Sequence, residues 1–131
     1  MVSKTRAVRI GERIREELSE IIIMQTQDPR IGGVTITDVK VDRELAFADI
    51  YVCTIEGVKR SQEVLSALEH AQGYLRRELA HRVELRVFPR LRFHWDPTFE
   101  KAEVIERLIS SLHADETVEQ DHNDVVSESD G

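Results

Sequence analysis

Arginines are the residues of this chain best suited to binding chemistry, and they gather in two segments. Three near the N-terminus recur at three- and four-residue spacing, and six more lie within residues 76–92 beside only two glutamates. Guanidinium groups grip phosphate oxygens with paired hydrogen bonds, and each neutralised phosphate adds a salt-dependent share of affinity. We therefore predict a surface that binds the phosphate backbone of a nucleic acid. The predicted RNA contacts are Arg6, Arg9, Arg13, Arg76, Arg77, Arg82, Arg86 and Arg90.

A helical pattern is interrupted directly before the second arginine segment. Apolar residues recur every three or four positions over residues 64–79, and Ala71, Gln72 and Gly73 fall inside this run. Glycine costs about 1 kcal/mol relative to alanine within a helix, so we predict a kink between two helices at these three residues. Two interpretations stay open, close approach of a phosphate to the backbone and relief of a packing clash. Either way, Gly73→Val is expected to damage both fold and binding.

Groups that could carry catalysis or hold a metal are few. The five histidines have neither paired metal-ligand spacing nor a companion cluster of cysteines. Gly32 and Gly33 are not followed by the lysine and serine or threonine of a phosphate-binding loop. His94 and Asp96 could share one face of a strand, but two ligands do not make a metal site. We expect a protein that is not an enzyme and that holds no metal and no cofactor.

The net charge of −7 is unevenly distributed. Residues 113–131 contain seven acidic residues and no lysine or arginine, whereas residues 1–112 carry equal numbers of acidic and basic residues. We therefore divide the chain into a folded domain of residues 1–112 and an acidic tail of residues 113–131, which we predict to be disordered. The tail could promote solubility, or it could compete with nucleic acid for the basic surface.

Two further features bear on the location of the protein. The single cysteine, Cys53, cannot form an internal disulfide, which suits a reducing compartment. The longest strongly apolar run, residues 21–24, is far too short to span a membrane. We expect a cytoplasmic protein with no membrane partner.

The arginines must be positioned by a small mixed fold. Periodicity predicts helices at residues 5–24, 59–70, 74–82 and 98–112, and strands at residues 34–41, 46–54 and 91–95. The first two strands are joined by a short polar connection, which predicts an antiparallel hairpin with Ala48, Ile50 and Val52 facing the core. The economical fold class is α+β, with helices on one side of a three-stranded sheet.

Five segments of the chain, taken in their order along the sequence, resemble the ribosome-binding factor A family of bacterial small-subunit assembly factors. The resemblance covers Arg6 to about Leu112. The segments are the helix from Arg6 to Gln25; Asp28-Pro29-Arg30; the hairpin with Asp42-Arg43-Glu44-Leu45-Ala46 at its turn; Ala71-Gln72-Gly73-Tyr74-Leu75-Arg76; and Leu85-Arg86-Val87-Phe88-Pro89-Arg90-Leu91-Arg92-Phe93.

This resemblance implies a KH-like (type II) domain in which the kink occupies the place of a nucleic-acid-clamping loop. It implies binding to the immature 30S ribosomal subunit and to 16S rRNA near its 5′ terminal helix. It also implies support for rRNA processing and cold growth, without catalysis, and a ribosome-associated GTPase as a partner. We expect a monomer. The alternative is a protein-interaction module whose basic stripes bind an acidic protein surface.

Overall fold

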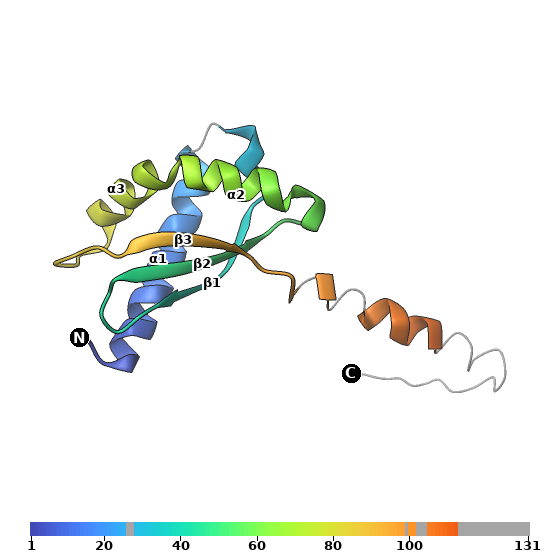
Figure 1. The fold of residues 1–131 in the computed structure, drawn as a ribbon, viewed down its shortest axis with the longest axis horizontal. Helices are drawn as coiled ribbons and strands as arrows, with labels where there is room; N and C mark the ends of the chain where they lie inside the picture. Colours follow the sequence, from blue (N-terminus) through green and yellow to red (C-terminus); the bar gives the residue numbers. More distant parts are fainter. Residues whose placement is uncertain (26–27, 99, 102–104, 113–131) are drawn as a thin grey trace. The chain divides into compact units, whose positions relative to one another are not determined.

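The computed structural model describes residues 1–25, 28–98, 100–101 and 105–112. Up to residue 95 the helices and strands follow the predicted order (Figure 1). Their bounds are α1 Lys4–Gln25, η1 Pro29–Ile31, β1 Thr35–Val41, β2 Phe47–Cys53, η2 Val58–Arg60, α2 Ser61–His70, α3 Gln72–Arg82 and β3 Arg90–Trp95, where η marks a short 3-10 turn.

The first helix, α1, buries the apolar stripe that its sequence predicts. Ile14, Leu18 and Ile21 recur at three- and four-residue spacing and are 0% exposed, which keeps them on one face of the helix. At its start the Oγ of Ser3 accepts a hydrogen bond from the backbone N–H of Arg6 at 3.0 Å. This contact satisfies one of the N–H groups that a helix leaves unpaired in its first turn.

The sheet has the strand order β1-β2-β3. β1 and β2 form the predicted antiparallel hairpin, and the register between them shifts between Ile36 and Asp38. β3 pairs in parallel with β2, beginning where Arg90 lies opposite Phe47. A parallel pair needs a crossover connection, and here α2 and α3 lie on that connection (Figure 1).

One hydrophobic core joins the three helices to one face of the sheet. Ala48, Ile50 and Val52 of β2 are buried in a single cluster with residues of α1, α2 and α3. The alternate residues of β2, among them Phe47 and Tyr51, point to the opposite face and are only half-buried. Within residues 1–97 the helices therefore cover one side of the sheet, which confirms the predicted α+β fold class.

Residues 1–97 form one compact unit, and the described residues from Thr98 onward belong to a second unit. In the second unit, residues 98, 100–101 and 105–112 are helical, in agreement with the predicted last helix. The predicted acidic tail lies outside the described residues. Within the described part of the chain, no helix is long and apolar enough to cross a membrane.

Candidate nucleic-acid interface

The predicted kink is present, and its centre is Ala71. α2 ends at His70 and α3 begins at Gln72, so Ala71, with φ −87° and ψ 0°, separates the two helices. The side chain of Gln72 donates a 2.6 Å hydrogen bond to the backbone oxygen of Leu91 in β3. Gln72 therefore anchors the kink to the sheet and fixes where α3 starts.

Gly73 lies in the first turn of α3 and has open space beside it. A Cβ added to Gly73 would meet no atom within 4 Å, and its φ is outside the left-handed region. The packing-clash interpretation of Gly73 is therefore wrong, because a first side-chain carbon would meet open space there. The expected damage from Gly73→Val stays a prediction. The open backbone leaves the other interpretation, phosphate approach, as a prediction.

Arginines from the start of α1 meet the chain that follows α3. A shallow groove is lined by Arg6, Arg9, Ile10 and Arg13 on one side and by residues 83–85 on the other. Arg6 and Arg9 are exposed. The structure thus places the first predicted arginine segment beside the end of the helix that carries Arg76, Arg77 and Arg82.

Arg13 and Arg82 take part in an ion-pair network between α1 and α3. The Nη1 of Arg82 lies 2.8 Å from Glu20 and 3.2 Å from Glu17, and these carboxylates raise the pKa of the guanidinium. Arg13 pairs with Glu17 at 2.7 Å and donates to the backbone oxygen of Arg82 at 3.2 Å. A cation at this position also complements the C-terminal end of α3. Both arginines thus join the helices, whether or not they also meet phosphate.

Arg76 differs from its neighbour Arg77. The Nη2 of Arg76 donates to the backbone oxygen of Phe88 at 2.7 Å, and its Nε donates to that of Pro89 at 3.1 Å. Arg76 is half-buried, whereas Arg77 is exposed. Both were predicted as RNA contacts, but Arg76 holds the segment before β3 against α3, and only Arg77 extends freely into solvent.

Arg86 and Arg90 flank Phe88 and are both exposed. The backbone N–H of Arg90 donates to the oxygen of Ala46 at 2.9 Å, which begins the pairing of β3 with β2. Its side chain is left outside the core. Five of the eight predicted arginine contacts, Arg6, Arg9, Arg77, Arg86 and Arg90, are therefore exposed and form none of the side-chain ion pairs described above.

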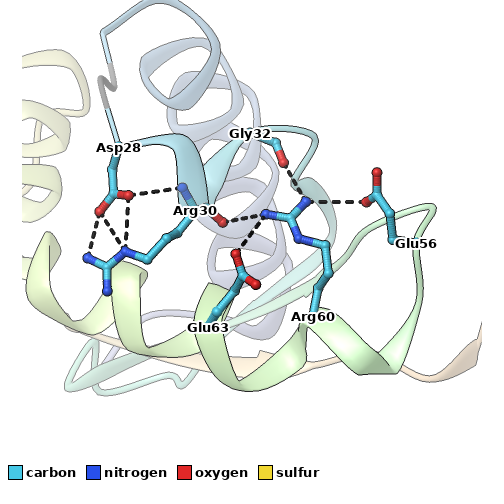
Figure 2. Close-up of polar contacts among 6 residues, drawn as sticks. All are labelled: Asp28, Arg30, Gly32, Glu56, Arg60 and Glu63. Atoms are coloured by element: carbon cyan, nitrogen blue, oxygen red, sulfur yellow. Dashed lines mark hydrogen bonds and ion pairs between the residues drawn. The ribbon is translucent and has the colours of Figure 1, made fainter.

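An arginine that the sequence reasoning did not select, Arg60, links two distant segments (Figure 2). Its guanidinium donates at 2.8 Å to the backbone oxygens of both Gly32 and Arg30. It also lies 3.2 Å from Glu56 and 3.5 Å from Glu63. Arg60 therefore closes the loop after α1 onto the start of α2, and no short-range pattern signals this role.

Asp28 and Arg30 form a second polar cluster in the same view (Figure 2). Arg30 grips the carboxylate of Asp28 through Nε and Nη2, and its backbone N–H donates to Oδ1 at 2.9 Å. The hydrogen bonds from Arg30 lower the pKa of Asp28 from 3.8 to about 2. Asp28 thus caps η1, a role that the sequence Asp-Pro-Arg signals because proline suits the first position of a helical turn.

Metal-binding geometry is not found in the part of the chain that the structure describes. No group of three or more His, Cys, Asp or Glu side chains there could hold a metal ion. The histidine considered in the sequence, His94, lies 2.7 Å from the Oδ1 of Asp49 in β2.

Comparisons with known proteins find relatives that cover most of the chain. The family model for ribosome-binding factor A matches residues 6–109. The chain is 41% identical over 112 residues to ribosome-binding factor A of Staphylococcus carnosus, covering 86% of this chain and 97% of that protein. It is 40% identical over 111 residues to the protein of the same name from Thiobacillus denitrificans, covering 85% and 90%.

Solved structures of the same family share the fold. The crystal structure of ribosome-binding factor A from Thermus thermophilus matches with a TM-score of 0.62 at 27% identity, covering 68% of this chain and 93% of that chain. A homology model of the Thermus thermophilus factor, fitted into a cryo-EM map of a 30S complex, matches with a TM-score of 0.58 at 26% identity, covering 70% and 96%.

Proposed function

Because this chain belongs to the ribosome-binding factor A family, we propose that it binds the immature 30S ribosomal subunit and supports its maturation. The proposed contact is 16S rRNA near its 5′ terminal helix, and the proposed outcome is support for rRNA processing and growth in the cold. The homology model of the Thermus thermophilus factor that was fitted into a cryo-EM map of a 30S complex supports the choice of partner.

The observation that carries this proposal is the groove in which Arg6 and Arg9 face residues 83–85. It brings exposed cations of α1 next to the segment that continues to Arg86 and Arg90. Backbone phosphates in folded RNA are the ligands that such cations suit, because shape and phosphate contacts dominate recognition of structured RNA. Three arginines, Arg6, Arg9 and Arg13, line the groove against one carboxylate, that of Glu84, and this excess of positive charge favours anions.

The proposed mode of action is binding and release, without a chemical step. Several weak phosphate contacts give an affinity that a rearrangement of the RNA, or a competing partner such as a ribosome-associated GTPase, can overcome. We further propose that the protein acts as a monomer in the cytoplasm.

Sedimentation tests the proposal. The protein is mixed with small subunits, large subunits and mature ribosomes at rising salt, and the bound fraction is measured in each pellet. We expect preference for the small subunit and an affinity that falls steeply with salt. The logarithm of the binding constant should fall with the logarithm of the salt concentration by about 0.7 to 0.9 for each phosphate contacted. Equal binding to all three particles would contradict the proposal and favour the protein-interaction module.

The acidic segment of residues 113–131 can be tested in the same assay with a variant that ends at Leu112. Tighter binding of this variant at low salt would support competition between the segment and RNA. Unchanged affinity together with lower solubility would support a solubilising role. The preference for the small subunit should be the same in both chains, because the proposed contacts lie in residues 6–90.

A further inference from the structure

The sheet face opposite the core carries two aromatic side chains, and a planar side chain of β3 covers each of them. The Cζ of Arg92 lies 3.9 Å from the ring centroid of Phe47. The rings of Tyr51 and His94 stack with centroids 5.0 Å apart and an interplanar angle of 26°. Two stacked pairs therefore lie side by side across the β2–β3 pairing.

A single carboxylate, that of Asp49, connects the outer members of both pairs. The Nε and Nη2 of Arg92 lie 2.8 and 3.1 Å from its two oxygens. The Nε2 of His94 lies 2.7 Å from Oδ1 of the same carboxylate. These contacts restrict the rotation of both side chains, so the guanidinium and the imidazole are held in place before any ligand arrives.

The outer surfaces of these two groups are accessible. The side chains of Arg92 and His94 are 50% and 41% exposed. Lys40 of β1 adds a further cation, with its Nζ 5.5 Å from the Tyr51 centroid. The carboxylate of Asp38 in β1, opposite Tyr51, accepts a hydrogen bond from the backbone N–H of Val39 at 2.9 Å.

We propose that this face, formed by Lys40, Phe47, Asp49, Tyr51, Arg92 and His94, binds unpaired RNA bases by stacking on Arg92 and His94. The proposal rests on the proposed function and extends it to a second contact, apart from the phosphate-binding arginines. Bases stack readily on guanidinium and aromatic planes. Bases inside a duplex are already stacked, so the site selects single-stranded segments.

The occupied edge of Arg92 favours bases over phosphates or an acidic protein surface. Paired hydrogen bonds to a phosphate or a carboxylate use the N–H edge of a guanidinium, and Asp49 already occupies the Nε and Nη2 of Arg92. What remains available is the Nη1 end of the group and the flat face turned away from Phe47, and a base can stack on that face while it accepts a hydrogen bond from Nη1. A planar, aromatic ligand uses that face, and Lys40 can neutralise its phosphate.

The proposal is tested with a ten-nucleotide single-stranded RNA that contains 2-aminopurine, a fluorescent base that is quenched when it stacks. A matched RNA carries abasic sites and so keeps the phosphates alone. Stacking of bases adds to affinity, so we expect the wild-type protein to prefer the base-containing RNA by at least about tenfold and to quench its fluorescence.

Arg92→Lys keeps the charge and removes the planar group, so it is expected to abolish the preference and most of the quenching. Arg15→Lys, an exposed arginine on α1 outside the proposed sites, is the matched control and should behave as wild type. Phe47→Leu provides a second test, because it removes the ring beneath Arg92. Thermal unfolding of each variant verifies that it is folded.

Equal wild-type affinity for the base-containing and abasic RNAs would overturn the inference, as would wild-type behaviour of folded Arg92→Lys. Sedimentation with small subunits separates this failure from failure of the proposed function. A protein that binds the small subunit but shows no preference for bases lacks the stacking site and keeps the function. A protein that neither binds the small subunit nor prefers base-containing RNA would contradict both the stacking site and the proposed function.

Discussion

Gly11 of α1 lies directly against the backbone oxygen of Val39 in β1. A Cβ added at Gly11 would be 2.6 Å from that oxygen, closer than van der Waals contact permits. Gly11 is itself buried. The absence of a side chain is what allows α1 to cross β1 so closely, and this contact sets the distance between helix and sheet along the edge of the core.

Gly11→Ala is therefore expected to destabilise the protein. Alanine gains about 1 kcal/mol of helix propensity over glycine, but the helix must move away from β1, and overpacking of this kind costs about 1 to 3 kcal/mol. We expect a net loss, measured as a lower midpoint of urea unfolding. A midpoint equal to or above that of the wild type would show that α1 shifts without cost.

Gly73→Ala is the matched comparison, and it should raise the free energy of unfolding where Gly11→Ala lowers it. No atom lies within 4 Å of the added Cβ at Gly73, so only the propensity difference remains, and the variant should be more stable by about 0.5 to 1 kcal/mol. The same urea experiment measures both glycines. Reduced binding of folded Gly73→Ala to small subunits would support phosphate approach at this glycine.

The contrast between these glycines shows where sequence reasoning ends. The helices and strands were predictable because apolar periodicity is local, as in the stripe of Ile14, Leu18 and Ile21. The need for glycine at position 11 arises from Val39, a residue 28 positions away that local patterns do not connect to it. The parallel pairing of β3 with β2 was unpredictable for the same reason.

The candidate site also depends on contacts between residues that are distant in the sequence. Arg76 and Arg77 are identical in type and adjacent in sequence, yet only Arg77 is exposed. Clusters of arginine could be found by counting charges. Which members hold the fold depends on partners such as the Phe88 oxygen and Glu20, which are brought near only by folding.

Arg76→Ala should lower stability, whereas Arg77→Ala should not. Loss of Arg76 leaves the oxygens of Phe88 and Pro89 without their charged donor, at a cost of about 1 to 3 kcal/mol. Arg77→Ala should change the free energy of unfolding by less than about 0.5 kcal/mol and should weaken binding to small subunits. Urea unfolding and sedimentation measure the two effects. Equal stability of the two variants would contradict the structural role of Arg76.

Arg60→Lys is expected to loosen the loop after α1. The lysine keeps the charge but cannot donate at once to the oxygens of Gly32 and Arg30 and pair with two glutamates. With this side chain only 17% exposed, we expect a loss of about 1 to 3 kcal/mol. Faster amide hydrogen exchange in residues 28–34 should accompany it. Exchange at wild-type rates there would contradict the role of Arg60, and Arg15→Lys is the control.

The lowered pKa of Asp28 predicts that the stability of the fold depends on pH in the acidic range. Its hydrogen bonds with Arg30 lower the pKa from 3.8, the ordinary value expected in the unfolded chain, to about 2 in the folded protein. The folded state therefore favours the ionised carboxylate. The stabilisation is complete well above pH 3.8 and is lost as pH falls toward 2.

Asp28→Asn isolates this contribution. The difference in free energy of unfolding between wild type and variant should be constant above about pH 5 and should shrink steadily from about pH 4 to pH 2. Other carboxylates with a lowered pKa, such as Asp49 and Glu56, are present in both proteins and cancel in the difference. Because the pair lies at the surface, added salt should also reduce the difference. A difference that does not change with pH would mean that Asp28 acts only as a neutral cap of η1.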